Sequence, residues 1–229
     1  MANEMKLDIR NYKDVENWTI AAAESIIMNI KMMYSLQGEV NLLLSGGITP
    51  GPIYKILDQD LGSFKRLTIG LVDERFVPTN HEHSNEKLIK KCFDSRPAEE
   101  YNIIGMVKDA ENESENLKLV RGAYEPFKNR TDIIVLGMGD DGHTASIFPN
   151  DLESDEVITN GQIDIFCTKA PVTPTNRITC SMDLICNARH IYLLISGQEK
   201  LGILKGDYQY PIHTVLEKRP DVQIYYLEK

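Results

Sequence analysis

Short apolar runs alternate with stretches of helical periodicity along most of this chain, and that alternation restricts the fold more than any other feature. The run at 132–136 is rich in apolar, β-branched residues, and polar residues do not alternate with them. This pattern is typical of a strand that is covered on both sides. In the segment 14–35, apolar residues recur at helical spacing. Together these patterns predict an α/β fold with a mostly parallel sheet and helices on both faces.

The same periodicities place the individual elements. We expect helices at 14–35, 52–60, 84–93, 113–128 and 198–205. We expect strands at 40–44, 67–72, 103–104, 132–136, 163–168, 177–180, 190–195 and 222–227. The polar stretch 150–162 is predicted to be a loop or a lid. Without an internal repeat or a long linker, the 229 residues are expected to form one domain over 1–229, with room for a small lobe in the C-terminal third.

The charge balance limits the partners that the chain can bind. Lys and Arg number 25 against 34 Asp and Glu, so the formal net charge is −9. No basic run stands out, whereas a duplex-binding domain needs a basic face to displace phosphate counterions, so nucleic acid is excluded as the expected partner. An acidic surface also repels anions at long range. Any anion site must therefore be local and built from a few well-placed cations.

Four cysteines, Cys92, Cys167, Cys180 and Cys186, carry no C-x-x-C spacing and are expected to be buried free thiols. The first residues contain no apolar core like that of a signal peptide, and no apolar run approaches the roughly 18 residues of a membrane helix. These features predict a cytoplasmic protein without membrane contact.

A first polar run, SGGITP at 45–50, directly follows the expected strand at 40–44. Its two glycines let the backbone turn and approach a ligand closely, and exposed N–H groups beside a helix start suit a phosphate or a carbonyl oxygen. Thr49 followed by Pro50 resembles a helix N-cap with proline at the first helical position. The alternative is a plain strand-to-helix turn. The ligand-binding candidates here are Ser45, Gly46, Gly47 and Thr49.

A second polar run, DERFVP at 73–78, follows the strand at 67–72, and the segment HEHSN at 81–85 comes close behind it. The two acids and the arginine at this strand end would be costly to bury unpaired, and Arg75 can hold a phosphate in a fork of two hydrogen bonds. The alternative is an Asp–Arg ion pair that fixes a loop. His81 and His83 invite a metal interpretation, but two histidines without a third convincing ligand rarely form a site, so no metal is predicted.

The third run, GMGDDGHTASIFP at 137–149, directly follows the strongest predicted strand. His143 is the candidate base, Asp141 lies two residues before it and can orient its ring, and Gly139 is a candidate backbone donor. We expect a helix to begin near His143, whose positive end would keep the imidazole neutral. The alternative is a surface histidine in a glycine-rich loop.

Two further cations lie next to predicted strands. Arg177 stands in NRIT just before one strand, and Lys200 stands in SGQEK just after another. Each alone is typical of a solvated surface cation. Together with Arg75 they can supply the local positive charge that an acidic protein needs to hold a dianion.

The ordered set SGGITP, VDERFVP, HEHSN, GMGDDGHTASIFP, NRIT and SGQEK resembles that of the 6-phosphogluconolactonases, from about residue 40 to about residue 205. The resemblance implies a Rossmann-like sheet, shared with sugar-phosphate isomerases and glucosamine-6-phosphate deaminases. It implies hydrolysis of 6-phospho-D-glucono-1,5-lactone to 6-phosphogluconate in the oxidative branch of the pentose phosphate pathway, with neither metal nor nicotinamide. The base maps onto His143, and substrate binding maps onto the SGG turn, Asp73, Arg75, Arg177 and Lys200.

The chain also departs from that pattern. Ile48 stands where the family often has serine, the tail from Pro211 to Lys229 is short, and Tyr225-Tyr226 stands where a tryptophan is frequent. These departures affect the C-terminal boundary and leave the proposed base untouched.

Hydrolysis of a lactone needs a positioned water, a base and an oxyanion site. His143 would take the proton of water while Asp141 holds the ring, and backbone N–H groups of Gly46, Gly47 or Gly139 would stabilise the oxyanion. No serine nucleophile is needed, and neither Ser45 nor Ser146 lies in a G-x-S-x-G motif.

Two other functions remain open. Glucosamine-6-phosphate deaminases carry a similar DGH run but continue it with a glutamate where this chain has Phe148, and they favour a tyrosine where it has Arg75. A non-catalytic sugar-phosphate-binding module would keep Arg75 and Lys200 but has no use for a histidine–aspartate pair. The partner in every case is a small phosphosugar, and the sequence fits a monomer or a dimer equally.

Overall fold

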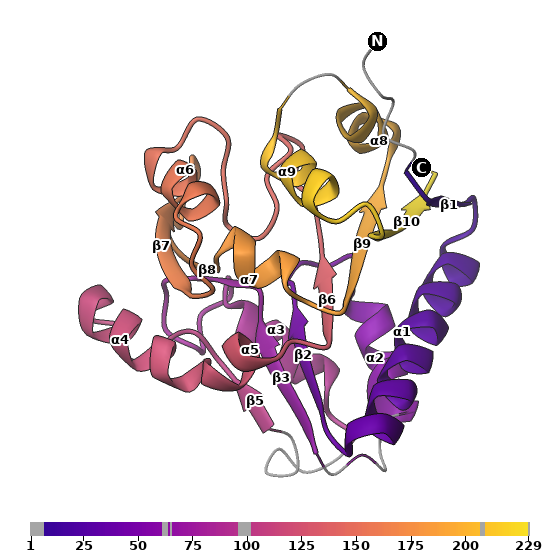
Figure 1. Cartoon of the computed structure of the whole chain (residues 1–229), viewed down its shortest axis with the longest axis horizontal. Helices are drawn as coiled ribbons and strands as arrows, with labels where there is room; N and C mark the ends of the chain where they lie inside the picture. Colours follow the sequence, from indigo (N-terminus) through magenta and orange to yellow (C-terminus); the bar gives the residue numbers. More distant parts are fainter. Residues whose placement is uncertain (1–6, 61–63, 65, 96–101, 207–208, 229) are drawn as a thin grey trace.

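A seven-stranded sheet forms the centre of the molecule, and all its strand pairs are parallel (Figure 1). The computed structural model describes residues 7–60, 64, 66–95, 102–206 and 209–228. The strand order is β1-β10-β9-β6-β2-β3-β5. The strands are β1 (Ile9–Tyr12), β2 (Val40–Leu44), β3 (Leu67–Leu71), β5 (Asn102–Ile104), β6 (Ile133–Leu136), β9 (His190–Ser196) and β10 (Gln223–Leu227).

The strand order reverses between β2 and β6. From β2 the chain builds outward through β3 to β5, then crosses back to β6 and builds outward through β9 to β10. This is the order of a Rossmann-like fold with β1 added at one edge, as the sequence predicts. In such sheets the crevice beyond the carboxyl ends at the reversal is where ligands bind, because the loops on its two sides diverge.

Helices cover both faces of the sheet, because each crossover between parallel strands returns along one face (Figure 1). α1 and α2 pack together over one face, and α5, α7 and α9 lie over the other. The helices are α1 (Val15–Gln37), α2 (Gly51–Asp60), α3 (Asn85–Cys92), α4 (Glu113–Ala123), α5 (Glu125–Asn129), α6 (Leu152–Thr159), α7 (Met182–Cys186), α8 (Gln198–Lys205) and α9 (Pro211–Lys218).

A second sheet of three antiparallel strands stands beside the carboxyl end of the large one. It contains β4 (Asp73–Arg75), β8 (Asn176–Cys180) and β7 (Ile165–Lys169). Because β4 leaves the end of β3 after one residue, this sheet extends the site loops outward. Its register sets Arg75 opposite Arg177, which are 102 positions apart in the chain (177 − 75).

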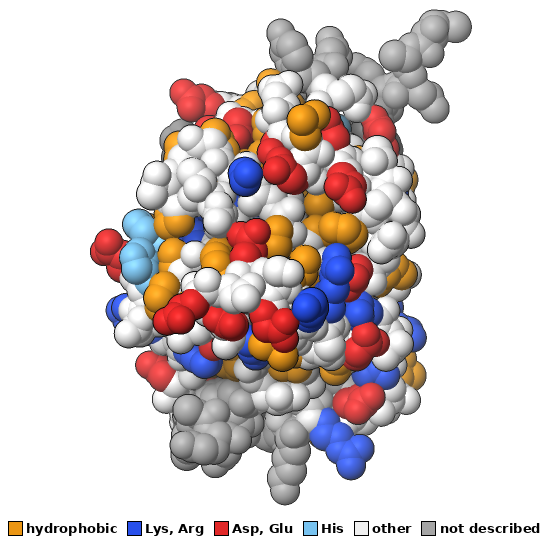
Figure 2. Space-filling view, turned by 90° about the vertical axis from the view of Figure 1, so that its left-hand side faces the viewer, with side chains coloured by type: hydrophobic (Ala, Val, Ile, Leu, Met, Phe, Trp, Pro, Cys, Tyr) orange, Lys and Arg blue, Asp and Glu red, His pale blue; other side chains and the backbone are white. Residues whose placement is uncertain are grey.

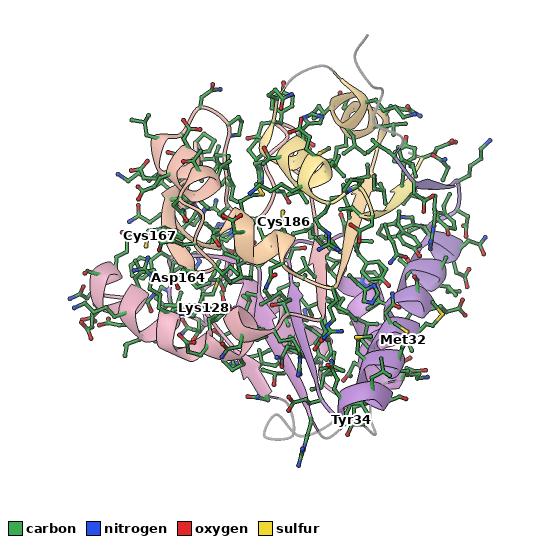
Figure 3. The ribbon with its side chains drawn as sticks, in the orientation of Figure 1. Met32, Tyr34, Lys128, Asp164, Cys167 and Cys186 are labelled. Atoms are coloured by element: carbon green, nitrogen blue, oxygen red, sulfur yellow. The ribbon has the colours of Figure 1, made fainter. Side chains whose placement is uncertain are left out.

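Below this second sheet, Lys128 and Asp164 point toward one another and form an ion pair of 3.3 Å (Figure 3).

The core lies on both faces of the central strands. Leu42, Leu43 and Leu44 on β2 are fully buried although their side chains alternate between the two faces. Each such side chain contributes about 1.5–3 kcal/mol through burial. On the outer face that carries α4 and α6, acidic and basic side chains are interspersed (Figure 2). That face therefore offers no extended field of one sign.

Most predicted elements lie within two residues of their expected bounds, and the differences have local causes. The segment 113–128 forms two helices, α4 and α5, because the chain turns at Tyr124 and restarts with Pro126 in the first turn of α5. The predicted loop or lid at 150–162 is wrong, since Asp151 caps a helix there by accepting a hydrogen bond from the Ser154 N–H at 2.9 Å. Strand β1 and helix α9 were not predicted.

The prediction of buried thiols is correct for only two of the four cysteines. All four are free, Cys92 and Cys180 are buried, and Cys167 and Cys186 are partly exposed. Cys167 on β7 and Cys186 on α7 belong to different elements and lie apart (Figure 3). Among the described residues, no helix is long and apolar enough to cross a membrane.

Candidate active site

Polar loops from four neighbouring strands meet at the carboxyl edge of the sheet. They follow β9, β6, β2 and β3, and the reversal of strand order lies in their middle. A cavity of about 210 Å³ opens between them. Nine of the predicted site residues line it: Ser45, Gly46, Gly47, Thr49, Asp73, Arg75, Gly139, His143 and Lys200.

A second hollow of about 500 Å³ adjoins the cavity, and the two share the residues Asp73, Arg75 and His143. The remaining predicted residues, Asp141 and Arg177, line this hollow. The structure therefore brings all eleven predicted site residues to one continuous cleft, although they come from five separate stretches of the chain. Their placement follows from the fold, since parallel strands deliver their following loops to the same edge.

His143 is held by Asp141 through two hydrogen bonds. The imidazole Nδ1 lies 2.5 Å from the Asp141 Oδ1, and the His143 backbone N–H donates to the same oxygen at 3.2 Å. A carboxylate accepts only, so Nδ1 carries the proton and Nε2, on the opposite side of the ring, keeps its lone pair. Burial raises the pKa of Asp141, but the contacts with His143 outweigh it and the pKa falls below its usual value.

The predicted helix start at His143 is wrong. The residues around it form turns with an isolated bridge between Thr144 and Ile147, and the next helix, α6, begins only at Leu152. The chain cannot continue as a right-handed helix here because Gly142 and Ala145 have φ values of +78° and +52°. The orientation of the ring and the tautomer with the proton on Nδ1 thus come from Asp141 and owe nothing to a helix terminus.

The glycines of this loop permit close packing around the imidazole. A Cβ at Gly139 would lie 2.1 Å from the His143 ring, so only glycine fits there. The Gly139 N–H donates to the His143 carbonyl oxygen at 2.9 Å, which engages it inside the loop and removes it as an oxyanion donor, contrary to expectation. Among the described residues, no hydrogen bond is made by the N–H groups of Gly46 and Gly47, and both glycines line the cavity.

Thr49 and Pro50 precede the helix by one residue more than predicted, since α2 begins at Gly51. The Tyr54 N–H donates to the Pro50 carbonyl oxygen at 3.0 Å, and the Tyr54 hydroxyl donates to the Ser45 carbonyl oxygen at 2.8 Å. The turn at 45–50 is therefore tied to the first turn of α2 at both ends.

Asp73 is fixed on one side and free on the other. Its Oδ2 accepts a hydrogen bond of 2.6 Å from the Ser146 hydroxyl, and its backbone carbonyl accepts from the Asn85 side chain at 3.0 Å. Ser146 is fully buried, so this bond joins the second polar run to the third. Asp73 thereby presents its remaining carboxylate oxygen toward the shared part of the cleft.

Glu74 and Asn85 are site residues that the sequence analysis did not assign. The buried Glu74 carboxylate accepts from the backbone N–H groups of Arg75, Asn85 and Glu86, at 2.7, 2.7 and 2.8 Å. Burial raises its pKa to about 7 against the effect of these donors. It fastens the start of α3 to β4, and Asn85 in that first turn lines the cavity. The available signal was Ser84, the helix cap that directly precedes Asn85 and follows the DERFVP run by six positions (84 − 78).

Arg75 and Arg177 form the cationic end of the cleft. They face each other across β4 and β8, and both line the larger hollow. The Arg75 Nη1 donates to the His83 carbonyl oxygen at 2.7 Å, while its buried Nε has no partner among the described residues. Burial, followed by the neighbouring charge of Arg75, lowers the pKa of Arg177. An unpaired buried Nε on Arg75 beside the buried side chain of Arg177 is typical of an anion site.

Lys200 reaches the cleft from the opposite side, on α8. Its Nζ donates to the Met138 carbonyl oxygen at 2.6 Å and lies 3.5 Å from the Asp140 carboxylate. It lines the cavity with His143 but not the hollow that contains Arg177. Arg75 lines both spaces and is therefore the cation that accompanies Lys200 in the cavity and Arg177 in the hollow.

His81 and His83 lie with ring centroids 5.3 Å apart on an exposed turn. Within the described parts of the chain, no group of three or more His, Cys, Asp and Glu side chains is arranged to hold a metal ion.

The protein has a Rossmann-like α/β fold, and its cleft brings a histidine–aspartate pair and an arginine pair together at the carboxyl edge of the sheet. Residues 13–224 match the model of a family described as glucosamine-6-phosphate isomerases/6-phosphogluconolactonase. The chain belongs to this family.

Proteins similar to this one match most of its length. The 6-phosphogluconolactonase of Neisseria meningitidis is 31% identical over 226 residues, which cover 95% of this chain and 97% of that protein. The enzyme of the same name from Pseudomonas aeruginosa is 32% identical, covering 80% of this chain and 78% of its own. The crystal structure of a 6-phosphogluconolactonase from Shewanella baltica superposes with a TM-score of 0.88 at 26% identity, covering 98% of both chains.

Proposed function

We propose that this protein hydrolyses 6-phospho-D-glucono-1,5-lactone to 6-phosphogluconate, with His143 as the general base that activates water. The names of the relatives support the reaction, and the Nδ1 contact of 2.5 Å between His143 and Asp141 carries the assignment of the base. That contact fixes the tautomer in which Nε2 accepts a proton, which is what attack by water requires.

The reaction follows from the groups in the cavity. Nε2 takes a proton from a water whose oxygen attacks the lactone carbonyl carbon, and the N–H groups of Gly46 and Gly47 stabilise the resulting oxyanion, each by about 3 kcal/mol. The bond between that carbon and the ring oxygen then breaks. The imidazolium returns its proton to the departing ring oxygen, so a hydroxyl and a carboxylic acid result, and the acid then releases its remaining proton to solvent as a carboxylate. Asp141 stabilises the transient imidazolium.

Arg75 and Arg177 are proposed to hold the phosphate in the larger hollow. The buried Nε of Arg75 has no partner among the described residues, and the Arg177 Nε donates to the Pro174 carbonyl oxygen at 2.9 Å. A phosphate can accept from the N–H groups that remain on both side chains. Lys200, already bound to the Met138 carbonyl oxygen, then faces the sugar end together with Asp73. Anchoring the remote phosphate restricts the lactone to the orientation in which water can attack it.

Phe148 favours hydrolysis over deamination or isomerisation. Its ring centroid lies 4.8 Å from that of His143, so it is adjacent to the base. A phenyl ring moves no proton, whereas an aldose–ketose rearrangement needs a second acid–base group beside the first. A mere phosphosugar-binding module would leave the His143–Asp141 pair without a use.

A timed lactone assay tests this function. Glucose 6-phosphate is oxidised in situ to the lactone, and lactone loss is followed with and without the protein after subtracting spontaneous hydrolysis. We expect loss that scales with protein concentration and no ammonia from glucosamine 6-phosphate. Ammonia release would instead support the deaminase function, and tight binding of 6-phosphogluconate without turnover would support the binding module. We propose that the protein acts in the cytoplasm on this small molecule.

A further inference from the structure

The C-terminal helices α8 and α9 contact the loop that carries His143 at two separate points. Both helices lie together beyond the carboxyl end of β9 (Figure 1). At the first point, Lys200 in the first turn of α8 donates to the Met138 carbonyl oxygen at 2.6 Å. Met138 lies five positions before His143, so this bond holds the beginning of the loop.

The second contact holds the end of the loop, at Gly142. A Cβ at Gly142 would lie 2.5 Å from Cγ of Tyr210, so the tyrosine side chain packs directly against the glycine backbone. The Ile212 N–H donates to the Gly142 carbonyl oxygen at 3.3 Å. Gly142 has a φ of +78° and immediately precedes His143, so its geometry sets the direction in which the imidazole leaves the loop.

His213 connects the two contacts. Its Nδ1 accepts from the Tyr210 N–H at 3.1 Å, so its proton is on Nε2, which donates to the carbonyl oxygens of Ile203 and Leu204 at 3.1 and 3.3 Å. Those carbonyls end the same helix, α8, whose first turn carries Lys200. His213 is 5% exposed, and Tyr210 stacks on it with ring centroids 5.8 Å apart.

We propose that Tyr210 is a positioning residue for the base, held in place by His213, and that α8 and α9 act as a clamp on the loop from Met138 to His143. The proposal rests on the proposed role of His143. A displacement of about 1 Å at a reacting group costs up to about 10²-fold in rate, so contacts that hold the loop from outside matter to the base. Tyr210 supplies a rigid surface against the one residue whose torsion angles aim the imidazole.

The test is a set of tyrosine variants assayed for lactone hydrolysis. Tyr210→Ala removes the side chain from Gly142 and should lower kcat about 10- to 100-fold, with KM changed less than about threefold. Tyr210→Phe keeps the atoms that contact Gly142 and should restore kcat to within about twofold of the parent. The matched control is Tyr34→Ala, which removes a partly buried tyrosine that packs on Phe64 at the far end of α1 (Figure 3). It should lower the melting temperature and leave kcat unchanged.

A double variant separates positioning from general stability. In a His143→Ala background, Tyr210→Ala should cause no further loss of kcat, because the group that it positions is absent. An equal loss in both backgrounds, or a change in KM alone, would overturn the clamp. If Tyr210→Ala does not fold, Tyr210→Leu takes its place in the same double-variant cycle. We then expect the same result: a lower kcat in the parent and no further loss in the His143→Ala background.

The activities of His143→Ala and Tyr210→Ala distinguish a failure of the proposed base from a failure of the clamp. If His143→Ala keeps its activity, the proposed base fails and the clamp fails with it. If His143→Ala loses activity while folded Tyr210→Ala keeps the parental kcat, only the clamp is wrong.

Discussion

The two ends of the cleft differ in how their polar groups are used. At the base end, the His143 Nδ1 is bonded to Asp141 and the Gly139 N–H is bonded to the His143 carbonyl. At the cation end, the Nε of Arg75 is buried without a partner among the described residues, and Arg177 lies beside it. Unused buried donors are costly unless a ligand satisfies them.

This difference indicates a division of labour. The base end is organised before substrate arrives, which lowers the barrier of the chemical step. The cation end is completed by the substrate, so its groups contribute to binding. Changes at the base end should therefore act on kcat, and changes at the cation end on KM.

The largest effect is expected at the base. His143→Ala should reduce kcat about 10²–10⁴-fold with little change in KM, because the loop keeps its shape while the proton acceptor is lost. Steady-state lactone kinetics on the folded variant measure both constants. Near-parental turnover would contradict the claim that the base end acts on kcat through His143.

Asp141→Asn should follow, with a loss of about 10²-fold in kcat, since an amide can donate to Nδ1 and stabilise the wrong tautomer. Asp155→Asn on the exposed face of α6 is the control and should match the parent in kcat. A parental kcat in Asp141→Asn would show that Asp141 only shapes the loop.

At the cation end, Arg177→Ala should raise KM about 10- to 100-fold, as expected for the loss of charge-assisted hydrogen bonds, with a smaller effect on kcat. Arg177→Lys keeps the positive charge but lacks the two-pronged guanidinium, so its KM should lie between those of the parent and Arg177→Ala. Arg66→Ala, an exposed arginine before β3, provides the control. If Arg177→Ala only lowers the melting temperature, the arginine pair is structural and the anion site must be sought elsewhere.

The smallest effect concerns Glu74, which lies between the two ends. Its pKa is raised from 4.5 to about 7 by burial, so the folded state binds a proton that the unfolded state has released. Its contribution to stability is therefore full below about pH 4.5 and is lost as pH rises through about 7. Glu74→Gln has no such titration. Melting temperatures between pH 4.5 and 8 should decline with pH more steeply in the parent, and parallel curves would contradict the raised pKa.

Much of this cleft could be predicted, because the strands and the loops that follow them can be located from the apolar and polar runs of the sequence. Apolar runs marked β2, β3, β6 and β9, and parallel pairing then sends the following loops to one edge. The Arg75–Arg177 pairing could not be predicted, because it depends on the register of an antiparallel sheet between distant segments. The contact of α9 with Gly142 could not be predicted either, because it joins segments that are distant in the chain and a local sequence pattern does not show such contacts.

The error at His143 has a definite physical origin. A histidine after a glycine-rich turn and before an apolar stretch suggests a helix start, but Gly142 and Ala145 adopt positive φ values. Ala145 has no local signal for that conformation, since an alanine favours right-handed helix. Glu74 was missed for a related reason, because its three backbone donors come together only when α3 folds against β4.

The tautomer of His143 is the most direct test of the account. ¹⁵N NMR of the protein labelled in its histidine rings, with the His143 signals assigned by their absence from His143→Gln, shows which nitrogen carries the proton in the neutral form. We predict the proton on Nδ1, bonded to Asp141, and a free lone pair on Nε2. A proton on Nε2 would leave no acceptor facing the substrate and would contradict His143 as the base.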